Sequence, residues 1–157
     1  MTRPSDRLRE LNLTLPPLTK PVGAYVPALR FDNTLLLSGQ IPMKDGKMAY
    51  AGKVGGAAGR SLEDAQAAAR LCTLNAIAVA ADAAGGIDNL ARVLKVVVYV
   101  ASNSGFTDQH KVANGASDLL AEVFGESGKH ARAAVGVAEL PLNATVEVDV
   151  MFTCAGM

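Results

Sequence analysis

The sequence predicts an α+β fold in which a mixed β-sheet carries two helices packed on one face. Strands and helices are expected in the order β-β-α-β-α-β-β, which excludes an all-helical and an all-strand protein. Two helices of about five turns cannot cover such a sheet from both sides, so the simplest packing places both on one face. No repeat, linker or tail in the 157 residues indicates a second folded unit.

The composition favours a core of small aliphatic side chains. Half of the residues are hydrophobic, but only 4% are aromatic and none is tryptophan, so alanine, valine and leucine must supply the core. Such side chains let helices and strands approach closely, but each buries little apolar area. A second burial surface, such as a subunit interface, would therefore help this chain.

The charge balance argues against a nucleic-acid-binding protein. The 15 lysines and arginines are matched by 15 aspartates and glutamates, with no long basic run. Residues 1–10 lack the apolar region of a signal peptide, and no apolar run approaches the ~20 residues of a membrane span. We therefore expect a cytoplasmic protein without a membrane segment, whose Cys72 and Cys154 are buried thiols.

The chain divides into a short N-terminal arm and one folded domain. Residues 1–20 are expected to hold one or two helical turns over 4–11, followed by an extended, proline-rich stretch. Residues 21–157 are expected to form a single domain.

The domain is expected to begin with two strands, Ala24–Arg30 and Thr34–Gln40, separated by turn residues. Gly39 marks a bend or a close backbone approach in the second strand. Residues 41–60 are rich in glycine and have little periodicity, which predicts a loop with a short strand near Met48.

The clearest element is a helix from Ser61 to about Ala84. Ser61 and Asp64 have the spacing of an N-terminal cap, and Gly85 follows the last helical residue. The side chains expected to face the sheet recur at helical spacing; they are Leu62, Ala65, Ala69, Cys72, Ala76 and Ile77.

Three further strands and a second helix complete the predicted fold. Val93–Ala101 is an almost unbroken apolar run, which predicts burial on both faces, and a helix follows over 108–123. The last two strands are Arg132–Ala138 and Thr145–Thr153. The final strand alternates, with Val146, Val148, Val150 and Phe152 on one face and Glu147, Asp149 and Met151 on the other.

Motifs of common catalytic and metal sites are absent from the sequence. It contains no G-x-S-x-G, H-E-x-x-H or GxxxxGK[ST] motif. His110 and His130 lack the further ligands that a metal ion needs, so no metal is expected. The pairs Gly55-Gly56 and Gly85-Gly86 do not follow a clear strand and are interpreted as turns.

Arg132 is the candidate that remains. It begins a strand of small apolar residues, where an arginine is either a surface residue or an anion receptor. The planar guanidinium can donate two parallel N–H groups to a carboxylate, and the neighbouring alanines and glycine leave space for a small ligand. Glu147, on the next strand, is either a functional carboxylate or part of a solvated strand face.

Short motifs follow one another along most of the chain. In order, they are Val22–Pro27, Leu37–Pro42, Ala65-Gln66, Leu74-Asn75, Arg92–Val96, Arg132 with Val135 and Val137, Leu140-Pro141 and Val146–Asp149. Together they resemble the YjgF/YER057c/UK114 family of reactive-intermediate deaminases, which is also called endoribonuclease L-PSP.

This resemblance implies a chorismate-mutase-like fold and a barrel-shaped homotrimer with a ligand cleft at each subunit interface. The implied activity is hydrolysis of reactive 2-imino acids, such as 2-iminobutanoate, to 2-oxo acids and ammonia. The expected ligand is a small carboxylate, and the catalyst is expected to need no cofactor.

The resemblance also implies roles for individual residues. Arg132 would clamp the substrate carboxylate, and Glu147 would orient or activate the attacking water or shuttle a proton. Tyr25 would line the cleft, and Ser38 and Gly39 would supply hydroxyl or backbone contacts near the imine carbon. Fixing the carboxylate in this way would hold the imine carbon in position for water.

Three departures indicate a divergent branch of the family. Ala134, whose backbone would help to hold the substrate, stands where the family often has cysteine. The segment from Phe106 to Arg132 is longer than in the archetype, so either Asn114 or Ser117 would take the place of its pocket-facing asparagine. The N-terminal arm is also untypical.

Two other functions remain open at the level of sequence. A non-catalytic trimer that binds a small carboxylate metabolite would use the same arginine. An endoribonuclease is disfavoured by the neutral charge and the few aromatic residues, because RNA binding usually relies on cationic grooves and base stacking.

Overall fold

The structure is a computed structural model that describes residues 2–18, 20–21 and 23–155. Thr19, which belongs to the predicted arm, and Val22, which begins the first motif, lie outside the described residues. So do Met1 and residues 156–157.

The predicted strands and helices occur in the expected order, and short additional elements lie among them. In chain order they are α1 (Pro4–Glu10), β1 (Ala28–Phe31), β2 (Thr34–Leu37), β3 (Met43–Lys44), β4 (Lys47–Met48), α2 (Leu62–Ala84), β5 (Leu90–Ala101), α3 (Gln109–Phe124), β6 (Ala131–Val137) and β7 (Val146–Cys154). Short 3₁₀ turns lie at Ile87–Asn89, Gly125–Gly128 and Pro141–Asn143.

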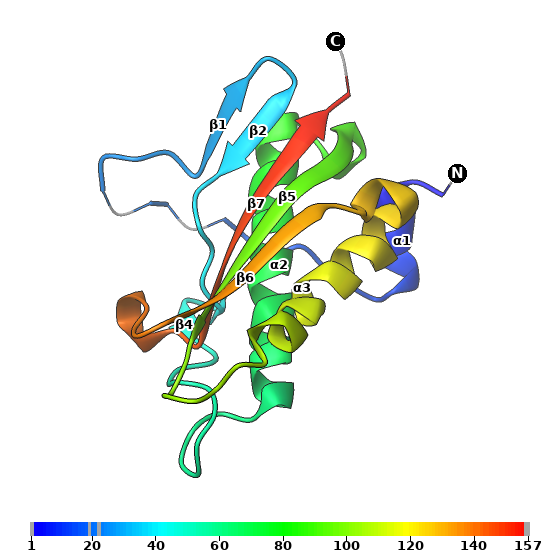
Figure 1. Ribbon diagram of the computed structural model, residues 1–157. Coiled ribbons are helices and arrows are strands. Elements are labelled where there is room, and N and C mark those ends of the chain that lie inside the picture. The colour runs from blue at the N-terminus through cyan, green and yellow to red at the C-terminus, as the bar shows by residue number, and fades with distance from the viewer. Residues whose placement is uncertain (1, 19, 22, 156–157) are drawn as a thin grey trace.

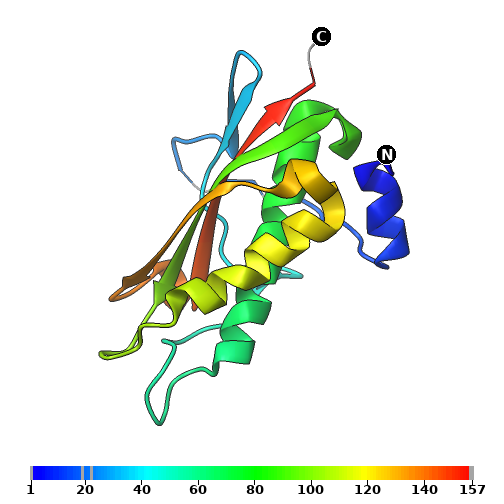
Figure 2. The ribbon, with the colours of Figure 1, turned by 45° about the vertical axis from the view of Figure 1, so that its right-hand side comes forward.

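The main sheet has five strands in the order β1-β2-β7-β5-β6. β5 and β6 are parallel and the other neighbours are antiparallel, so the sheet is mixed, as predicted. Figures 1 and 2 show α2 and α3 side by side on one face of this sheet. We call this the helix face, and we call the opposite side, which no helix of the described residues covers, the open face. The predicted α+β architecture is confirmed.

The two long helices pack closely because small residues lie where they cross. Ser61 caps α2 by accepting a hydrogen bond from the Asp64 backbone N–H at 3.1 Å, and Gly85 ends it in a left-handed conformation. A Cβ atom on Gly115 of α3 would lie 2.1 Å from the Gln66 backbone oxygen of α2. This contact realises the close approach that the alanine-rich composition predicts.

Helix α2 is also the one segment of the described residues that is long and apolar enough, by length and composition, to cross a membrane. Over half of its most apolar window, 56%, is buried inside the fold. Its inward residues Ala65, Ala69, Cys72 and Ile77 are fully buried, as the periodicity predicts. We therefore interpret α2 as the core helix of the domain.

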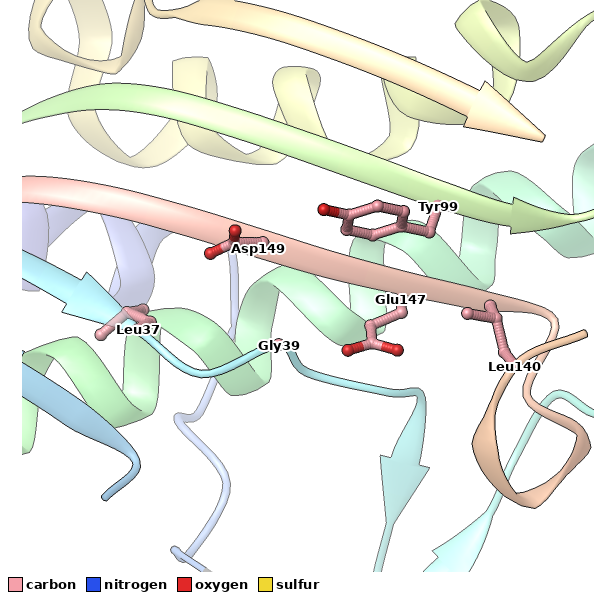
Figure 3. Close-up of a pocket in the computed structure, with 6 residues that line it drawn as sticks. All are labelled: Leu37, Gly39, Tyr99, Leu140, Glu147 and Asp149. Carbon is pink, nitrogen blue, oxygen red and sulfur yellow. The ribbon is translucent and has the colours of Figure 1, made fainter. Parts of the chain in front are cut away.

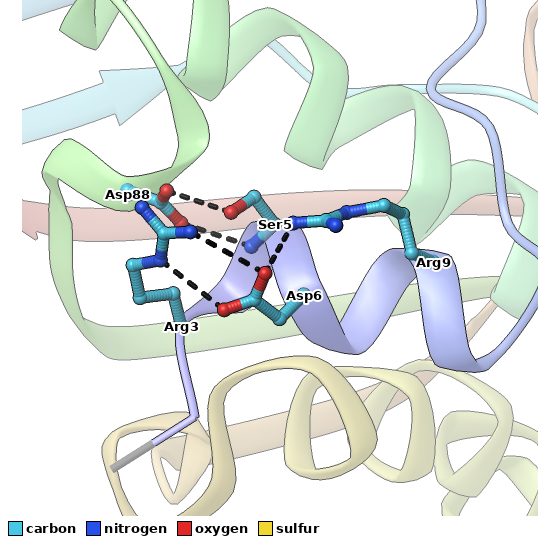
Figure 4. Close-up of polar contacts among 5 residues, drawn as sticks. All are labelled: Arg3, Ser5, Asp6, Arg9 and Asp88. Atoms are coloured by element: carbon cyan, nitrogen blue, oxygen red, sulfur yellow. Dashed lines mark hydrogen bonds and ion pairs between the residues drawn. The ribbon is translucent and has the colours of Figure 1, made fainter.

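The N-terminal helix α1 is anchored to the domain, as Figure 4 shows. The backbone N–H and hydroxyl of Ser5 donate to the Asp88 carboxylate at 2.9 and 2.7 Å. Arg7 donates to the Glu122 backbone oxygen of α3 at 3.0 Å, and Leu8 is buried in the main core. Residues of the predicted arm therefore form part of the packed structure.

The first two predicted strands have other bounds in the structure, where β1 is Ala28–Phe31 and β2 ends at Leu37 instead of Gln40. Residues 24–27 are not in a strand, because β2 ends at Leu37 and its partner β1 therefore begins only at Ala28. The predicted 41–60 loop contains a hairpin of β3 and β4. Asp45 and Gly46 form its turn with positive φ values of 52° and 75°, the conformation that Asp-Gly pairs favour.

Strand β5 lies in the middle of the sheet, but only one of its faces is fully buried in a single chain. Val96, Val98 and Val100 are fully buried against the helices. Val97 and Tyr99, on the open face, are half-buried. The prediction of burial on both faces is therefore wrong for one chain, because nothing within the described residues covers the open face.

Candidate functional site

Arg132 lies near the start of the edge strand β6 and points toward α3. It is directly opposite the buried Val96 of β5, so it belongs to the helix face. Its Nη1 atom donates to Asn114 Oδ1 at 2.9 Å and to Ser117 Oγ at 3.1 Å, and its Nη2 atom donates to the His110 backbone oxygen at 3.3 Å. Both of the helix residues that the sequence left as alternatives therefore contact Arg132.

The three acceptors come from a single stripe of α3. Residues 110, 114 and 117 are separated by four and three positions, so all three lie on one side of the helix, and residue 110 contributes its backbone oxygen. Strand β6 is parallel to β5 and its other edge is unpaired within the sheet. The guanidinium is thus held at an exposed sheet edge by neutral groups.

The charge of Arg132 has no carboxylate partner among the described residues. About half of the basic side chains, by contrast, form ion pairs, whereas Arg30 and Arg92 each have a single backbone acceptor. Arg70 pairs with Glu122 at 2.6 Å. Lys53 and Arg60 line a pocket of about 670 Å³ beside the glycine-rich loop, and each contacts a carboxylate. A positioned cation with only neutral partners is suited to bind an external anion.

Glu147 lies on the open face, in a second group of residues. It is opposite Tyr99 of β5, and the two line a pocket of about 240 Å³ together with Leu37, Gly39, Leu140 and Asp149. Figure 3 shows Glu147, Asp149 and Tyr99 on the same side of the sheet. Alternation along β7 places both carboxylates on this face, as the sequence predicts.

A bulge in the second strand makes room for the Glu147 carboxylate. Leu36 is opposite Met151, and Gln40 forms a bridge with Val148, so four steps along one strand match three along the other. The additional residue is accommodated where Ser38 and Gly39 lie, between β2 and Gln40. A Cβ atom on Gly39 would lie 2.1 Å from Glu147 Oε1. Gly39 is therefore a close backbone approach, as predicted.

Burial and a neighbouring charge favour the neutral form of Glu147. Desolvation raises the pKa of this half-buried carboxyl above its ordinary value, and the Asp149 carboxylate raises it further. Desolvation also raises the pKa of Asp149. A carboxyl whose pKa is raised in this way is a candidate proton-transfer group.

The remaining candidates are distributed over both groups. Ser38 donates its hydroxyl to the Val26 backbone oxygen at 2.7 Å, which links it to the segment that carries Tyr25. Tyr25 is 55% exposed and so is free to contact a ligand or another subunit. Ala134, two residues after Arg132 on β6, packs against the core, so only its backbone is available to a ligand.

The structure therefore does not bring all candidates together within one chain. Arg132, Asn114, Ser117 and the backbone of Ala134 lie on or beside the helix face at the β6 edge. Tyr25, Ser38, Gly39 and Glu147 belong to the second group, beside or on the open face. The sequence did not predict this separation.

The geometry adds residues that were not among the sequence candidates. Tyr99 and Asp149 line the Glu147 pocket, and His130 contacts Ser117. The alternation of β7 already indicated Asp149, since it shares a face with Glu147. Tyr99 lies in an apolar strand, where it is not distinguished from core residues. The contact of His130 with Ser117 depends on where α3 packs, which the sequence does not show. Among the described residues, no group of three or more His, Cys, Asp or Glu side chains could hold a metal ion.

A Gly39→Ala substitution tests how closely activity depends on this packing. The added methyl group would displace the Glu147 carboxyl, which is the flexible end of a side chain, so the fold should be preserved. We expect an almost unchanged Tm and a fall in kcat of about tenfold to 100-fold on the substrate proposed below, because small displacements of a reacting group are costly. In a Glu147→Gln background the same change should have little further effect, and an equal loss there would contradict this explanation.

Together, the fold and the site define a mixed α+β protein with an arginine held by neutral acceptors at a sheet edge and a half-buried carboxyl on the open face. The chain matches, over residues 5–153, the protein family described as "YjgF/chorismate mutase-like, putative endoribonuclease". It belongs to this family.

Relatives cover nearly the whole chain. Protein TCP17 of Trypanosoma cruzi is 43% identical over 150 residues, which are 95% of this chain and 92% of the relative. The crystal structure of Atu1372 from Agrobacterium tumefaciens, a protein of unknown function, is 45% identical, with a TM-score of 0.85 over 96% of this chain and 91% of that one. A 2-iminobutanoate/2-iminopropanoate deaminase of Dermatophagoides farinae is 30% identical, over 87% of this chain and 91% of its own length.

Proposed function

We propose that this protein hydrolyses small 2-imino acids to 2-oxo acids and ammonia, in clefts between the subunits of a homotrimer. The observation that carries the proposal is the state of Arg132, which is held by three neutral acceptors and has no carboxylate partner among the described residues. The deaminase among the relatives supports this class of substrate. The natural imino acid would be set by the residues that line the cleft.

The trimer is part of the proposal because one chain separates its two groups of candidate residues. Arg132 and Glu147 point to opposite faces of the same sheet, so one small molecule cannot contact both within a chain. A ring of copies can place the Arg132 edge of one subunit against the open face of the next. This arrangement would also cover the exposed Leu29, Phe31, Leu36 and Val135.

The chemistry requires few groups. Arg132 would hold the substrate carboxylate through its planar fork, which positions the imine carbon for water. A protonated imine is already a good electrophile, so a single acid–base group suffices. Glu147, whose pKa is raised by burial and by Asp149, would accept a proton from water and return one to the leaving nitrogen. Ser38 and Gly39 would border the reacting carbon.

The activity can be tested directly with imines released by a threonine dehydratase. We expect the protein to lower the amount of imine that a trapping reagent captures, with equal formation of 2-oxo acid and ammonia. A protein that binds small carboxylates but does not accelerate imine loss, across several imino acids, would instead be a metabolite-binding trimer. Ribonuclease activity that survives both Arg132→Ala and rigorous removal of contaminating nucleases would favour the endoribonuclease alternative.

A subunit-mixing experiment tests the shared site. Arg132→Ala and Glu147→Gln proteins should each be almost inactive, but unfolding and refolding them as a 1:1 mixture should restore activity. In randomly assembled trimers, about one interface in four would combine the intact Arg132 of one subunit with the intact Glu147 of another. Activity of about a quarter of wild type supports the intersubunit site, whereas no recovery, or a monomer by light scattering, contradicts it.

A further inference from the structure

We infer that His130 is a positioning residue for Arg132 and acts through the hydroxyl of Ser117. This inference rests on the proposed function, since it concerns how the carboxylate-binding group is held. His130 lies in the segment between α3 and β6, two residues before Arg132. Its ring contacts Ser117 of α3 and the backbone of Gly128 rather than any carboxylate in the described residues.

The hydrogen-bond partners determine where the protons lie. His130 Nδ1 is 2.6 Å from the backbone oxygen of the buried Gly128. A carbonyl oxygen can only accept, so Nδ1 carries the proton and Nε2 of the neutral imidazole is an acceptor. Nε2 lies 3.0 Å from Ser117 Oγ, so Ser117 donates its hydroxyl proton to His130.

The direction of this bond leaves the Ser117 oxygen free for Arg132. With its proton turned toward His130, the hydroxyl presents a lone pair to Arg132 Nη1 at 3.1 Å. The same Nη1 atom also donates to Asn114 at 2.9 Å. A chain of hydrogen bonds therefore runs from Arg132 through Ser117 and His130 to Gly128, and each donor in it has an acceptor.

Without His130 the serine would have a competing arrangement. A serine inside a helix readily donates to the backbone oxygen four residues earlier, here that of Ala113. In that arrangement its proton no longer points to residue 130, and its lone pairs are no longer directed toward Arg132. The guanidinium would keep its charge but lose one of three restraints. Substrate capture should weaken while the chemistry at Glu147, on the open face, continues.

Two substitutions separate this role from a general effect on folding. His130→Asn keeps a donor that can reach Gly128 but is too short to reach Ser117. His130→Gln places an amide oxygen near the position of Nε2, where it can accept from Ser117. We expect KM for the imino acid to rise about three- to tenfold in His130→Asn, with kcat within about twofold of wild type. His130→Gln should return KM to within about twofold of wild type.

A second measurement needs no catalytic activity. Nitrogen-15 NMR of the wild-type histidine side chains should show His130 protonated at Nδ1. The Nη protons of Arg132, assigned with an Arg132→Lys spectrum, should be resolved because hydrogen bonds hinder rotation of the guanidinium. They should become averaged in His130→Asn and stay resolved in His130→Gln.

The outcomes are distinct. An Nε2-protonated His130, or His130→Asn protein with the wild-type KM and wild-type Arg132 resonances, overturns the inference. If kcat falls as much as KM rises and His130→Gln does not restore either, His130 is merely structural and the inference is also overturned. A wild-type protein that does not hydrolyse imines removes the proposed function, while the NMR comparison still decides the hydrogen-bond chain.

Discussion

Replacing Arg132 with alanine is expected to lower kcat/KM for small 2-imino acids by about 30-fold to several thousand-fold. The guanidinium is positioned by Asn114, Ser117 and the His110 backbone, and it has no carboxylate partner among the described residues, so its charge is available to the substrate. In the proposed cleft between subunits, the pair of Arg132 and the substrate carboxylate would be partly desolvated. Truncating one partner of such a pair costs about 2–5 kcal/mol, and each 1.4 kcal/mol is about a tenfold change. Steady-state kinetics, in which the remaining imine is trapped and quantified, measures the loss of kcat/KM.

Two controls accompany this measurement. Arg132→Lys should recover only part of the activity, because an ammonium group lacks the planar fork that meets both carboxylate oxygens. Light scattering should report three times the 16.2 kDa chain mass for the wild type and both variants, since Arg132 is exposed and contributes little to the core. A fully active Arg132→Ala protein would show that the carboxylate binds elsewhere.

Replacing Glu147 with glutamine should lower kcat by about 100-fold or more while KM changes much less. The substitution keeps the shape of the side chain but removes its ability to exchange a proton, and general acid–base groups contribute about 100- to 10,000-fold. The carboxylate of the substrate is held by Arg132, on a different element, so binding should persist. Equal losses in kcat and affinity would indicate that Glu147 only shapes the pocket.

The pH profile gives an independent test of the same role. A base must be ionised, so kcat/KM should rise with pH as Glu147 loses its proton, which gives the pH profile a rising limb. This limb should lie above the ordinary carboxyl range, because burial and the Asp149 charge both raise the pKa of Glu147. Removing the neighbouring charge favours ionisation, so Asp149→Asn should move the limb to lower pH. The limb should vanish in Glu147→Gln, and an identical profile in that variant would contradict a proton-transfer role.

Periodicity made the central elements of the fold predictable. The helix expected from Ser61 to Ala84 begins and ends within one residue of α2, because its cap, its apolar spacing and its terminal glycine all agree. The last strand alternates in the structure as it does in the sequence, with Val146, Val148 and Val150 buried and Glu147 half-buried. In both elements, local preference and tertiary burial favour the same conformation.

The predictions failed where long-range pairing decided the outcome. Residues 24–27 have strand-like composition but extend beyond the β1–β2 ladder, which starts at Ala28. Val93–Ala101 was expected to be buried on both faces, yet a single chain leaves the Tyr99 side half-buried. Such features depend on which partner covers a strand, and no short stretch of sequence contains that information.

The sequence alone determined the element order, the small-residue core and the chemical candidates Arg132 and Glu147, because periodicity and side-chain chemistry are local properties. Only the tertiary structure decided that these two residues point to opposite faces. Their faces are set by register with β5, where Arg132 is opposite Val96 and Glu147 is opposite Tyr99. A shift of one residue in either register would move a side chain to the other face, and that register depends on contacts between distant segments of the chain.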